Sequence, residues 1–104
     1  MAITIATEDR NGTPVVKAGG EVDLYSSPQM RDALMKAISA AHDGVGVDLS
    51  EVSYMDSSGV AVLVEGLKAA GKKKLGFKLV SPSQPVLKVL QLSRLDRVFT
   101  IEES

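Results

Sequence analysis

The chain has 104 residues, of which 44% are hydrophobic and 24% are charged, and its formal net charge is -1. This balance predicts a single globular domain over residues 1–104 and argues against nucleic acid as the main partner. The chain contains no cysteine, which excludes disulfide bonds, thiolate zinc sites and a cysteine nucleophile. We find no secretory signal and no apolar run of about 18 residues, so we expect a cytoplasmic protein without direct membrane insertion.

The first residues predict a β-hairpin. Ile3 and Ile5 alternate with small or polar residues, which is the pattern of a half-buried strand. Asn11-Gly12 is a strong signal for a tight turn, and a second strand is expected over Thr13–Ala18. Pro14 near the start of that strand lacks a backbone N–H, which suggests an edge position or a β-bulge.

A first helix is expected after the hairpin. Ser27 is a good N-cap, and Pro28 suits the first helical position. The apolar residues that follow recur with helical spacing, and they are Met30, Ala33, Leu34, Ala37, Ile38 and Ala41. We expect this helix to end at Gly44, with His42 in its last turn.

The middle of the chain predicts a strand that leads directly into a second helix. Residues 45–49 alternate as in a strand, and the apolar character continues to Met55. The helix is expected over Ser57–Ala70, with Gly71 as its C-cap. Its inward-facing stripe consists of Val60, Leu63, Val64 and Leu67.

The opposite face of this second helix carries an unusually smooth strip. Val62, Gly66 and Ala69 recur at helical spacing where charged residues are normally expected. Two explanations are equally open. The strip is either a contact with another element of the same fold or a docking face for a partner helix, since small residues permit close approach.

The last third of the chain predicts a strand, a helix and a strand. The fourth strand is expected over Leu75–Leu79 and the final strand over Arg97–Ile101. Between them, Ser81–Pro85 breaks the chain and opens a short third helix, whose apolar face consists of Val86, Leu87, Val89, Leu90 and Leu92. The element order is therefore β-β-α-β-α-β-α-β. This order predicts an α/β protein with a mixed sheet of about five strands and three helices, in which right-handed crossovers join parallel strands.

Most candidates for chemistry have a simpler structural explanation. His42 is the single histidine, so we expect neither a metal site nor a Ser-His-Asp triad. No glycine-rich phosphate loop occurs, and Lys72–Lys74 is typical of a solvated loop. Asp23, Asp48 and Asp56 end strand-like runs and could meet at one rim, but acid–base catalysis would also need a pocket and shifted pKa values. We therefore expect no enzymatic activity and no cofactor.

The strand and the second helix meet at Asp56-Ser57-Ser58-Gly59. In the structural interpretation, Asp56 or one of the serines caps the helix and Gly59 allows a tight start. No Glu or Gln follows at the position that would complete a capping box, so two serines are more than one cap needs. The functional interpretation is a modifiable serine at the protein surface.

These residues resemble the signature of the STAS domain, named for sulfate transporters and anti-sigma factor antagonists. The resemblance lies in Asp48-Leu49-Ser50 followed by Met55–Val60. Gly20–Asp23 is similar to the family's Gly-x-Leu/Val-Asp stretch, and Leu79–Phe99 resembles its closing strand, helix and strand. Family members usually continue into a further helix, which we expect to be absent or minimal in a sequence that ends at Ser104.

The resemblance implies a small bacterial anti-sigma factor antagonist that acts by partner switching. Unphosphorylated, such a protein binds an anti-sigma factor, often also a serine kinase, and frees the sigma factor. Phosphorylation of the first serine in the motif ends the complex, and a serine phosphatase resets it. By position the phosphoacceptor is Ser57, its loop is shaped by Asp56, Ser58 and Gly59, and Asp23 matches the acidic residue beside the site.

One alternative of another class stays open. STAS-like domains also occur as small cytoplasmic accessory subunits of lipid-transport ABC systems, where the serine can be a contact residue only. The intact Asp-Ser-Ser-Gly motif and the signature upstream of it favour the antagonist.

Overall fold

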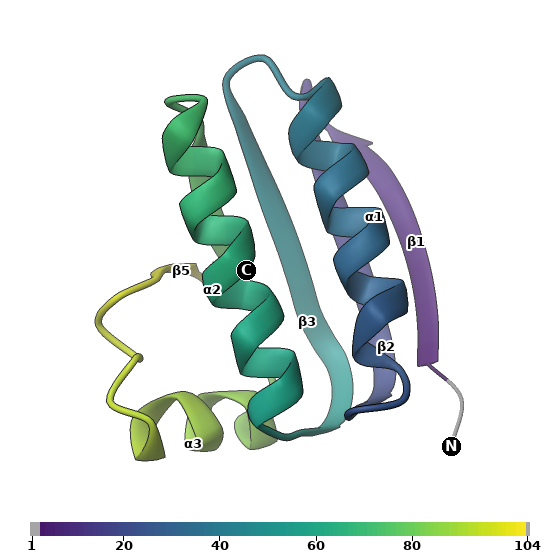
Figure 1. Cartoon of the computed structure of the whole chain (residues 1–104), viewed down its shortest axis with the longest axis vertical. Helices are drawn as coiled ribbons and strands as arrows, with labels where there is room; N and C mark the ends of the chain where they lie inside the picture. Colours follow the sequence, from purple (N-terminus) through teal and green to yellow (C-terminus); the bar gives the residue numbers. More distant parts are fainter. Residues whose placement is uncertain (1–2, 104) are drawn as a thin grey trace.

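The computed structural model describes residues 3–103, and this part of the chain forms a five-stranded mixed sheet with three helices (Figure 1). Its elements in chain order are β1 (Ile3–Arg10), β2 (Thr13–Val22), α1 (Ser27–Ala40), β3 (Gly44–Met55), α2 (Ser57–Lys72), β4 (Gly76–Val80), α3 (Gln84–Leu92) and β5 (Thr100–Glu102). The strands lie in the order β1-β2-β3-β4-β5, with β1 antiparallel to β2 and all later pairs parallel. The predicted fold class and element order are confirmed.

Two of the helices form a layer on one face of the sheet. α1 and α2 lie side by side on this face, and α3 lies near the start of α2 (Figure 1). The largest fully buried side chains fill the space between helices and sheet, and they are Met30, Leu34, Leu49, Leu63, Leu79 and Leu90. Within residues 3–103 no helix is both long and apolar enough to cross a bilayer.

The hairpin turn is confirmed, but the second strand does not lie at an edge. Asn11 and Gly12 have φ angles of 56° and 86°, the left-handed conformation that Asn-Gly favours. β2 lies between β1 and β3. Pro14 is tolerated there because the parallel pairing with β3 begins one residue later, at Val15 opposite Gly46.

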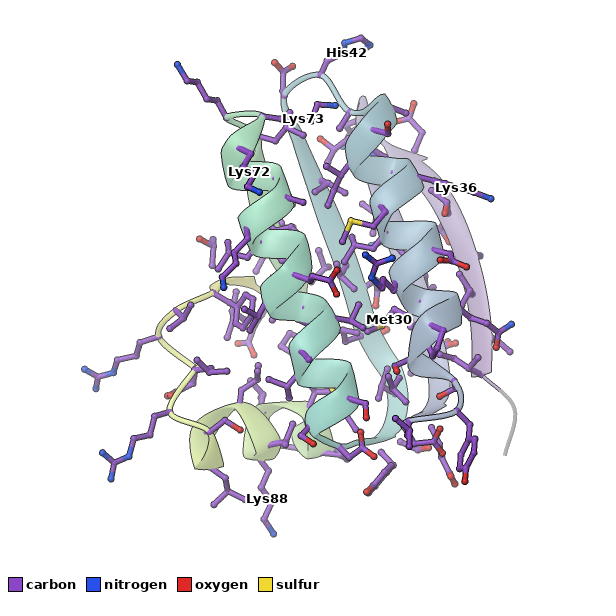
Figure 2. All side chains as sticks on the ribbon, viewed as in Figure 1. Met30, Lys36, His42, Lys72, Lys73 and Lys88 are labelled. Atoms are coloured by element: carbon purple, nitrogen blue, oxygen red, sulfur yellow. The ribbon has the colours of Figure 1, made fainter. Side chains whose placement is uncertain are left out.

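The ends of α1 differ from the prediction by a few residues. The helix begins at Ser27 itself, with Ser26 rather than Ser27 as the N-cap. It ends at Ala40, so His42 lies in the exposed loop after the helix instead of in its last turn (Figure 2). Gly44 does not end the helix, because it is already the first residue of β3.

α2 also ends later than predicted. It continues through Gly71 to Lys72, and Lys73 is the C-cap. Lys74 then has a φ of 59°, so a lysine takes the left-handed position that glycine often occupies after a helix. Because the residue at this position is not a glycine, the sequence pattern carried no signal for the true end of the helix.

The last strand is shorter than predicted. β5 covers Thr100–Glu102 instead of Arg97–Ile101. The preceding residues form a turn in which the Val98 amide donates a hydrogen bond to the Leu95 carbonyl, 3.0 Å away. Arg97 and Phe99 therefore belong to the connection, although Phe99 is buried in the core.

The smooth strip on α2 is a contact within the fold, and the alternative of a docking face is wrong. Val62 is only 5% exposed, and Gly66 is buried. A Cβ atom on Gly66 would lie 2.5 Å from Cδ2 of Leu34 and 3.0 Å from the ring of Phe77. Helix α1 and strand β4 therefore already occupy this face, and the glycine is needed because they approach so closely.

Candidate functional site

The junction between β3 and α2 presents one serine to the solvent. Asp56 is the N-cap of α2, and its Oδ1 accepts a hydrogen bond from the Ser58 amide at 2.8 Å. Ser57 is the first residue of the helix and is exposed, whereas Asp56 and Ser58 are half-buried. No residue within 3–103 forms a hydrogen bond with the Ser57 hydroxyl. The capping function predicted for this motif thus belongs to Asp56, and the Ser57 hydroxyl is left available.

Gly59 fixes how the helix starts. A Cβ atom at this position would lie 2.6 Å from Cγ of Met55 and 2.8 Å from Cγ1 of Val22. Both distances are shorter than real side chains allow, so any larger residue would push the first turn of α2 away from the sheet. The close contact holds the first turn against β2 and β3 and leaves Ser57 on the outer side.

Asp23 shapes the neighbouring loop between β2 and α1. Its carboxylate accepts hydrogen bonds from the amides of Tyr25 and Ser26, at 2.9 and 3.0 Å. The Ser26 hydroxyl donates to the Glu21 carbonyl at 2.7 Å, which closes the turn from the other side. The hydrogen bond from the Ser26 amide, followed by the one from Tyr25, holds the pKa of Asp23 below its usual value although partial desolvation opposes this. Asp23 is therefore a charged residue whose carboxylate organises its own loop.

The two loops meet at the same end of the sheet. Val22 and Met55, the last residues of β2 and β3, are partners in the parallel register. The Asp56 amide donates a hydrogen bond to the Val22 carbonyl at 3.2 Å and ties the loops together. The predicted convergence of Asp23 and Asp56 at one rim is therefore correct.

Asp48 does not belong to this rim. It lies in the middle of β3, opposite Lys17 on β2 and Val80 on β4. Its carboxylate forms an ion pair with Arg10 at 2.8 Å and accepts hydrogen bonds from the amide and hydroxyl of Ser50. The prediction placed Asp48 near a strand end because the alternating run covers only residues 45–49, but β3 continues for seven more residues to Met55.

The sequence prediction missed two exposed apolar residues at this end of the sheet. Leu24 is 69% exposed and Tyr25 is 89% exposed, although both are large hydrophobic side chains. They project from the loop that Asp23 holds, beside the junction that carries Ser57. Exposed aromatic and aliphatic side chains on a rigid loop are typical of a protein-binding surface. The sequence does contain a signal for this exposed pair: two large apolar residues stand between an aspartate and two serines and belong to no periodic pattern.

Comparison with known proteins assigns the chain to a family. The family model described as "Mlab, STAS domain" matches residues 5–102. The chain therefore belongs to the STAS-domain family, as the motifs had indicated.

The chain is similar to named antagonists in sequence. It is 28% identical to the anti-sigma-B factor antagonist of Staphylococcus epidermidis over 103 residues, which cover 99% of this chain and 95% of that protein. The corresponding protein of Staphylococcus aureus is 27% identical with the same coverage. These relatives are regulators by name.

The structural comparisons agree with the sequence comparisons. An anti-sigma factor antagonist from Mycobacterium paratuberculosis matches with a TM-score of 0.88 and 28% identity, covering 97% of this chain and 86% of that chain. The anti-sigma factor antagonist SpoIIAA in its unphosphorylated form matches with a TM-score of 0.80 and 26% identity, covering 97% and 88%. The Bacillus SpoIIAA structure in its phosphorylated form matches with a TM-score of 0.75 and 25% identity, covering 97% and 91%.

Proposed function

We propose that this chain is a cytoplasmic anti-sigma factor antagonist that is switched by phosphorylation of Ser57. In the unmodified form it binds an anti-sigma factor that is also a serine kinase, and the sigma factor is released. Phosphorylation ends this complex, and a serine phosphatase restores it. The observation that carries the proposal is the exposed Ser57 hydroxyl, which forms no hydrogen bond within residues 3–103 and lies beside an exposed apolar loop.

The position of Ser57 suits a phosphate group. Phosphorylation adds about 1.5 to 2 negative charges and three strong acceptor oxygens. At the N-terminus of α2 this charge is tolerated, because the positive end of the helix dipole favours an anion by roughly 0.3 to 1 kcal/mol. The modified protein should therefore stay folded, and the effect of the phosphate should fall on the interface.

The surroundings of Ser57 are already acidic before modification. The carboxylates of Asp23 and Asp56 lie in the two loops that meet at this end of the sheet. A phosphate would add to this charge and would repel any acidic group of a partner. Like charges that are brought together in an interface cost several kcal/mol, which is enough to dissociate a complex of moderate affinity.

The other residues of the motif have supporting roles in this proposal. Asp56 caps α2 through the Ser58 amide, Gly59 holds the first turn against the sheet, and Asp23 positions the loop of Leu24 and Tyr25. Val62 and Gly66 do not belong to the proposed partner surface, because both are buried and Leu34 of α1 and Phe77 of β4 lie against Gly66.

The test is phosphorylation of the purified chain by its cognate kinase. The chain is incubated with that kinase and ATP, and the added mass is located by peptide mass spectrometry. We expect one phosphate on Ser57, none on the variant Ser57→Ala, and unchanged modification of the matched variant Ser58→Ala. Phosphate on another residue, or normal modification of Ser57→Ala, would disprove the proposed site.

The accessory-subunit alternative makes a different prediction. The curated relatives and solved structures described above carry the antagonist name, which favours the antagonist over a subunit of a lipid-transport system. A pull-down with Ser57→Ala and Ser57→Asp as baits separates the two. An antagonist should retain a kinase-type partner only with Ser57→Ala, whereas an accessory subunit should retain transporter components with both.

A further inference from the structure

We infer that this chain forms a symmetric dimer in which the β1 strands of two copies pair antiparallel and their α1 helices face each other. The inference does not depend on the proposed function. It rests on an unprotected sheet edge, a groove beside that edge and a self-complementary pair of charges.

The first five residues of the edge strand β1 lack the usual protection. Within the described residues, β1 is the terminal strand of the sheet and pairs with β2 through eight residues without a register shift. Proteins normally protect such edges with short strands, charges, proline or bulges. β5 at the other edge has only three residues, which fits this rule. Residues 3–7 of β1 contain no charge and no proline, so this edge is suited to receive another strand.

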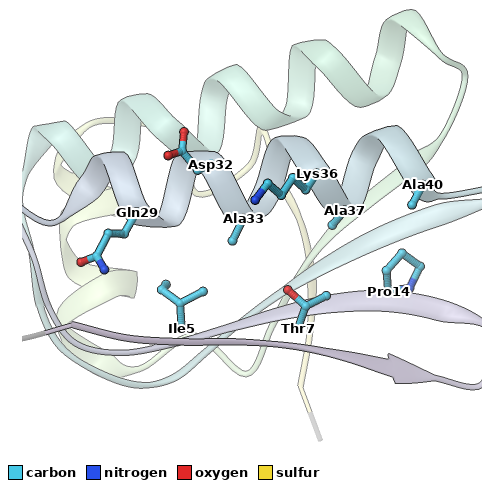
Figure 3. A pocket seen from close by; sticks show the side chains of 9 residues that line it. All are labelled: Ile5, Thr7, Pro14, Gln29, Asp32, Ala33, Lys36, Ala37 and Ala40. Carbon is cyan, nitrogen blue, oxygen red and sulfur yellow. The ribbon is translucent and has the colours of Figure 1, made fainter.

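A groove with a volume of about 580 Å³ runs beside this edge, between α1 and the hairpin (Figure 3). Its floor consists of Ile5, Thr7 and Pro14. The wall on the α1 side consists of Gln29, Asp32, Ala33, Lys36, Ala37 and Ala40. Ile5 and Pro14 are only half-buried, because α1 covers the floor from one side and the described chain places no further helix beyond β1.

The charges of the groove favour a second copy as the occupant. Asp32 and Lys36 lie one helical turn apart on the same wall, and neither forms an ion pair with any residue in 3–103. A two-fold axis between two antiparallel α1 helices brings Asp32 of each copy opposite Lys36 of the other. The surface is therefore complementary to itself, which is the requirement for an isologous interface.

One two-fold axis fits both the pairing of the two β1 strands and the arrangement of the two α1 helices. Ile5 lies below the stretch of α1 near Gln29 and Ala33, and Thr7 lies below Lys36 and Ala37 (Figure 3). The midpoint between the two charged residues is therefore close to the level of Ala6, which lies between Ile5 and Thr7 in β1.

Antiparallel pairing centred on Ala6 brings no like charges together. It places Ile5 opposite Thr7 of the second copy and Thr4 opposite Glu8. The two α1 helices are then separated by about three strand spacings, roughly 14 Å. A helix with its side chains is about 10 to 12 Å wide, so long side chains from the two helices can meet across the gap.

The oligomeric state of the full chain tests this inference. Sedimentation velocity over a concentration series should show a species with twice the 11.0 kDa mass of the chain. The variant Ala6→Lys places two ammonium groups on the axis and should raise the dimer dissociation constant at least about tenfold. Ala6 is exposed, so the monomer should stay folded, which circular dichroism checks. Lys68→Asp on the exposed side of α2 is the matched control and should leave the dimer unchanged.

Charge reversal tests the register of the dimer. Asp32→Lys and Lys36→Asp should each weaken the dimer, and an equimolar mixture of the two variants should restore it as a heterodimer. The double variant Asp32→Lys/Lys36→Asp should also dimerise. A monomer at all concentrations, a dimer that Ala6→Lys leaves intact, or a mixture that fails to associate would each overturn the inference.

Discussion

The ammonium group of Lys73 donates a hydrogen bond to the backbone carbonyl of Ile38, 2.8 Å away, and a second one to the carbonyl of Ser39 at 3.0 Å. Both acceptors lie in the last turn of α1, and the Ile38 carbonyl also accepts a hydrogen bond from the amide of the C-cap residue Ala41 at 3.3 Å. α1 has no basic residue of its own in that turn. One lysine of the Lys72–Lys74 triplet at the end of α2 thus caps the neighbouring helix, whereas the sequence had indicated only a solvated loop.

This contact predicts a small loss of stability on substitution of Lys73. In Lys73→Met the carbonyls of Ile38 and Ser39 lose a charged donor at the negative end of the helix dipole. We expect the free energy of unfolding to fall by about 1 kcal/mol, measured by urea titration. Lys68→Met, an exposed lysine in the middle part of α2, is the control and should change it by much less. Equal losses in the two variants would contradict the capping role.

Two glycines of α2 should respond to alanine in opposite directions. Gly59→Ala forces a methyl group against Met55 and Val22 and should destabilise the fold by about 1 to 3 kcal/mol. A Cβ atom at Gly71 meets nothing within 4 Å, so Gly71→Ala should stabilise the helix by roughly 0.5 to 1 kcal/mol. Thermal unfolding of both variants checks the prediction, and it fails if Gly59→Ala is as stable as the wild type.

The ion pair on the sheet predicts a dependence of stability on pH. Burial raises the pKa of Asp48, but the hydrogen bonds from Ser50 and the ion pair with Arg10 outweigh it, so the pKa of the folded state is lowered. A lowered pKa means that ionised Asp48 stabilises the protein above the unfolded-state pKa, and that this contribution is lost as the pH falls through the folded-state pKa.

The variant Asp48→Asn isolates this contribution. Its free energy of unfolding should lie below that of the wild type near neutral pH, and the gap should narrow as the pH falls below the usual aspartate pKa, about 3.9. Urea titrations between neutral and acidic pH measure the gap. A difference that stays constant over the whole range would show that Asp48 contributes by packing and not by charge.

A permanent charge at the proposed switch should abolish binding without unfolding the chain. Ser57→Asp adds an anion at the N-terminus of α2, where it is tolerated. We expect the affinity for the anti-sigma factor to fall about a hundredfold, which corresponds to roughly 3 kcal/mol. Isothermal titration calorimetry measures it, with Ser93→Asp as a control at an exposed site after α3. Retained affinity in Ser57→Asp would show that charge at this position is not the switch.

The exposed loop of Tyr25 should contribute to the same interface. Tyr25→Ala removes an aromatic side chain that is 89% exposed, so its melting temperature should match that of the wild type. If this residue anchors the partner, the affinity should fall at least about tenfold, which is typical of a buried aromatic contact. Leu92→Ala, at a residue that is 76% exposed at the end of α3, is the control. Equal effects of the two substitutions would remove Tyr25 from the interface.

The sequence predicted the elements well wherever one side of an element is buried. α1 buries one stripe, and β1 half-buries the alternating residues Ile3 and Ile5, so the period of their apolar residues was enough to identify these elements. α2 packs against the sheet on one face and against its neighbour α1 on another, and therefore buries two faces. Its second face consists of small residues such as Gly66, which carry no clear periodic signal and allowed two interpretations.

The candidate site was only partly predictable for a similar reason. The strand–helix junction and its motif are local in sequence, so Ser57 and its cap could be found. The contact between Asp56 and Val22 joins segments that are distant in sequence, and only the strand register reveals it. The exposure of Leu24 and Tyr25 depends on the turn that the Asp23 carboxylate shapes through its hydrogen bonds. The shape of this turn cannot be read from the amino-acid composition.

Neighbouring residues at the junction between β3 and α2 have separate roles. Asp56 supplies the cap, Gly59 supplies the close packing, and the side chain of Ser57 takes part in neither. Substitution at position 57 can therefore be selected for its effect on recognition alone, while positions 56 and 59 stay constrained by folding. A lineage could lose or regain a modifiable residue here in one mutational step, without a compensating change elsewhere in the domain.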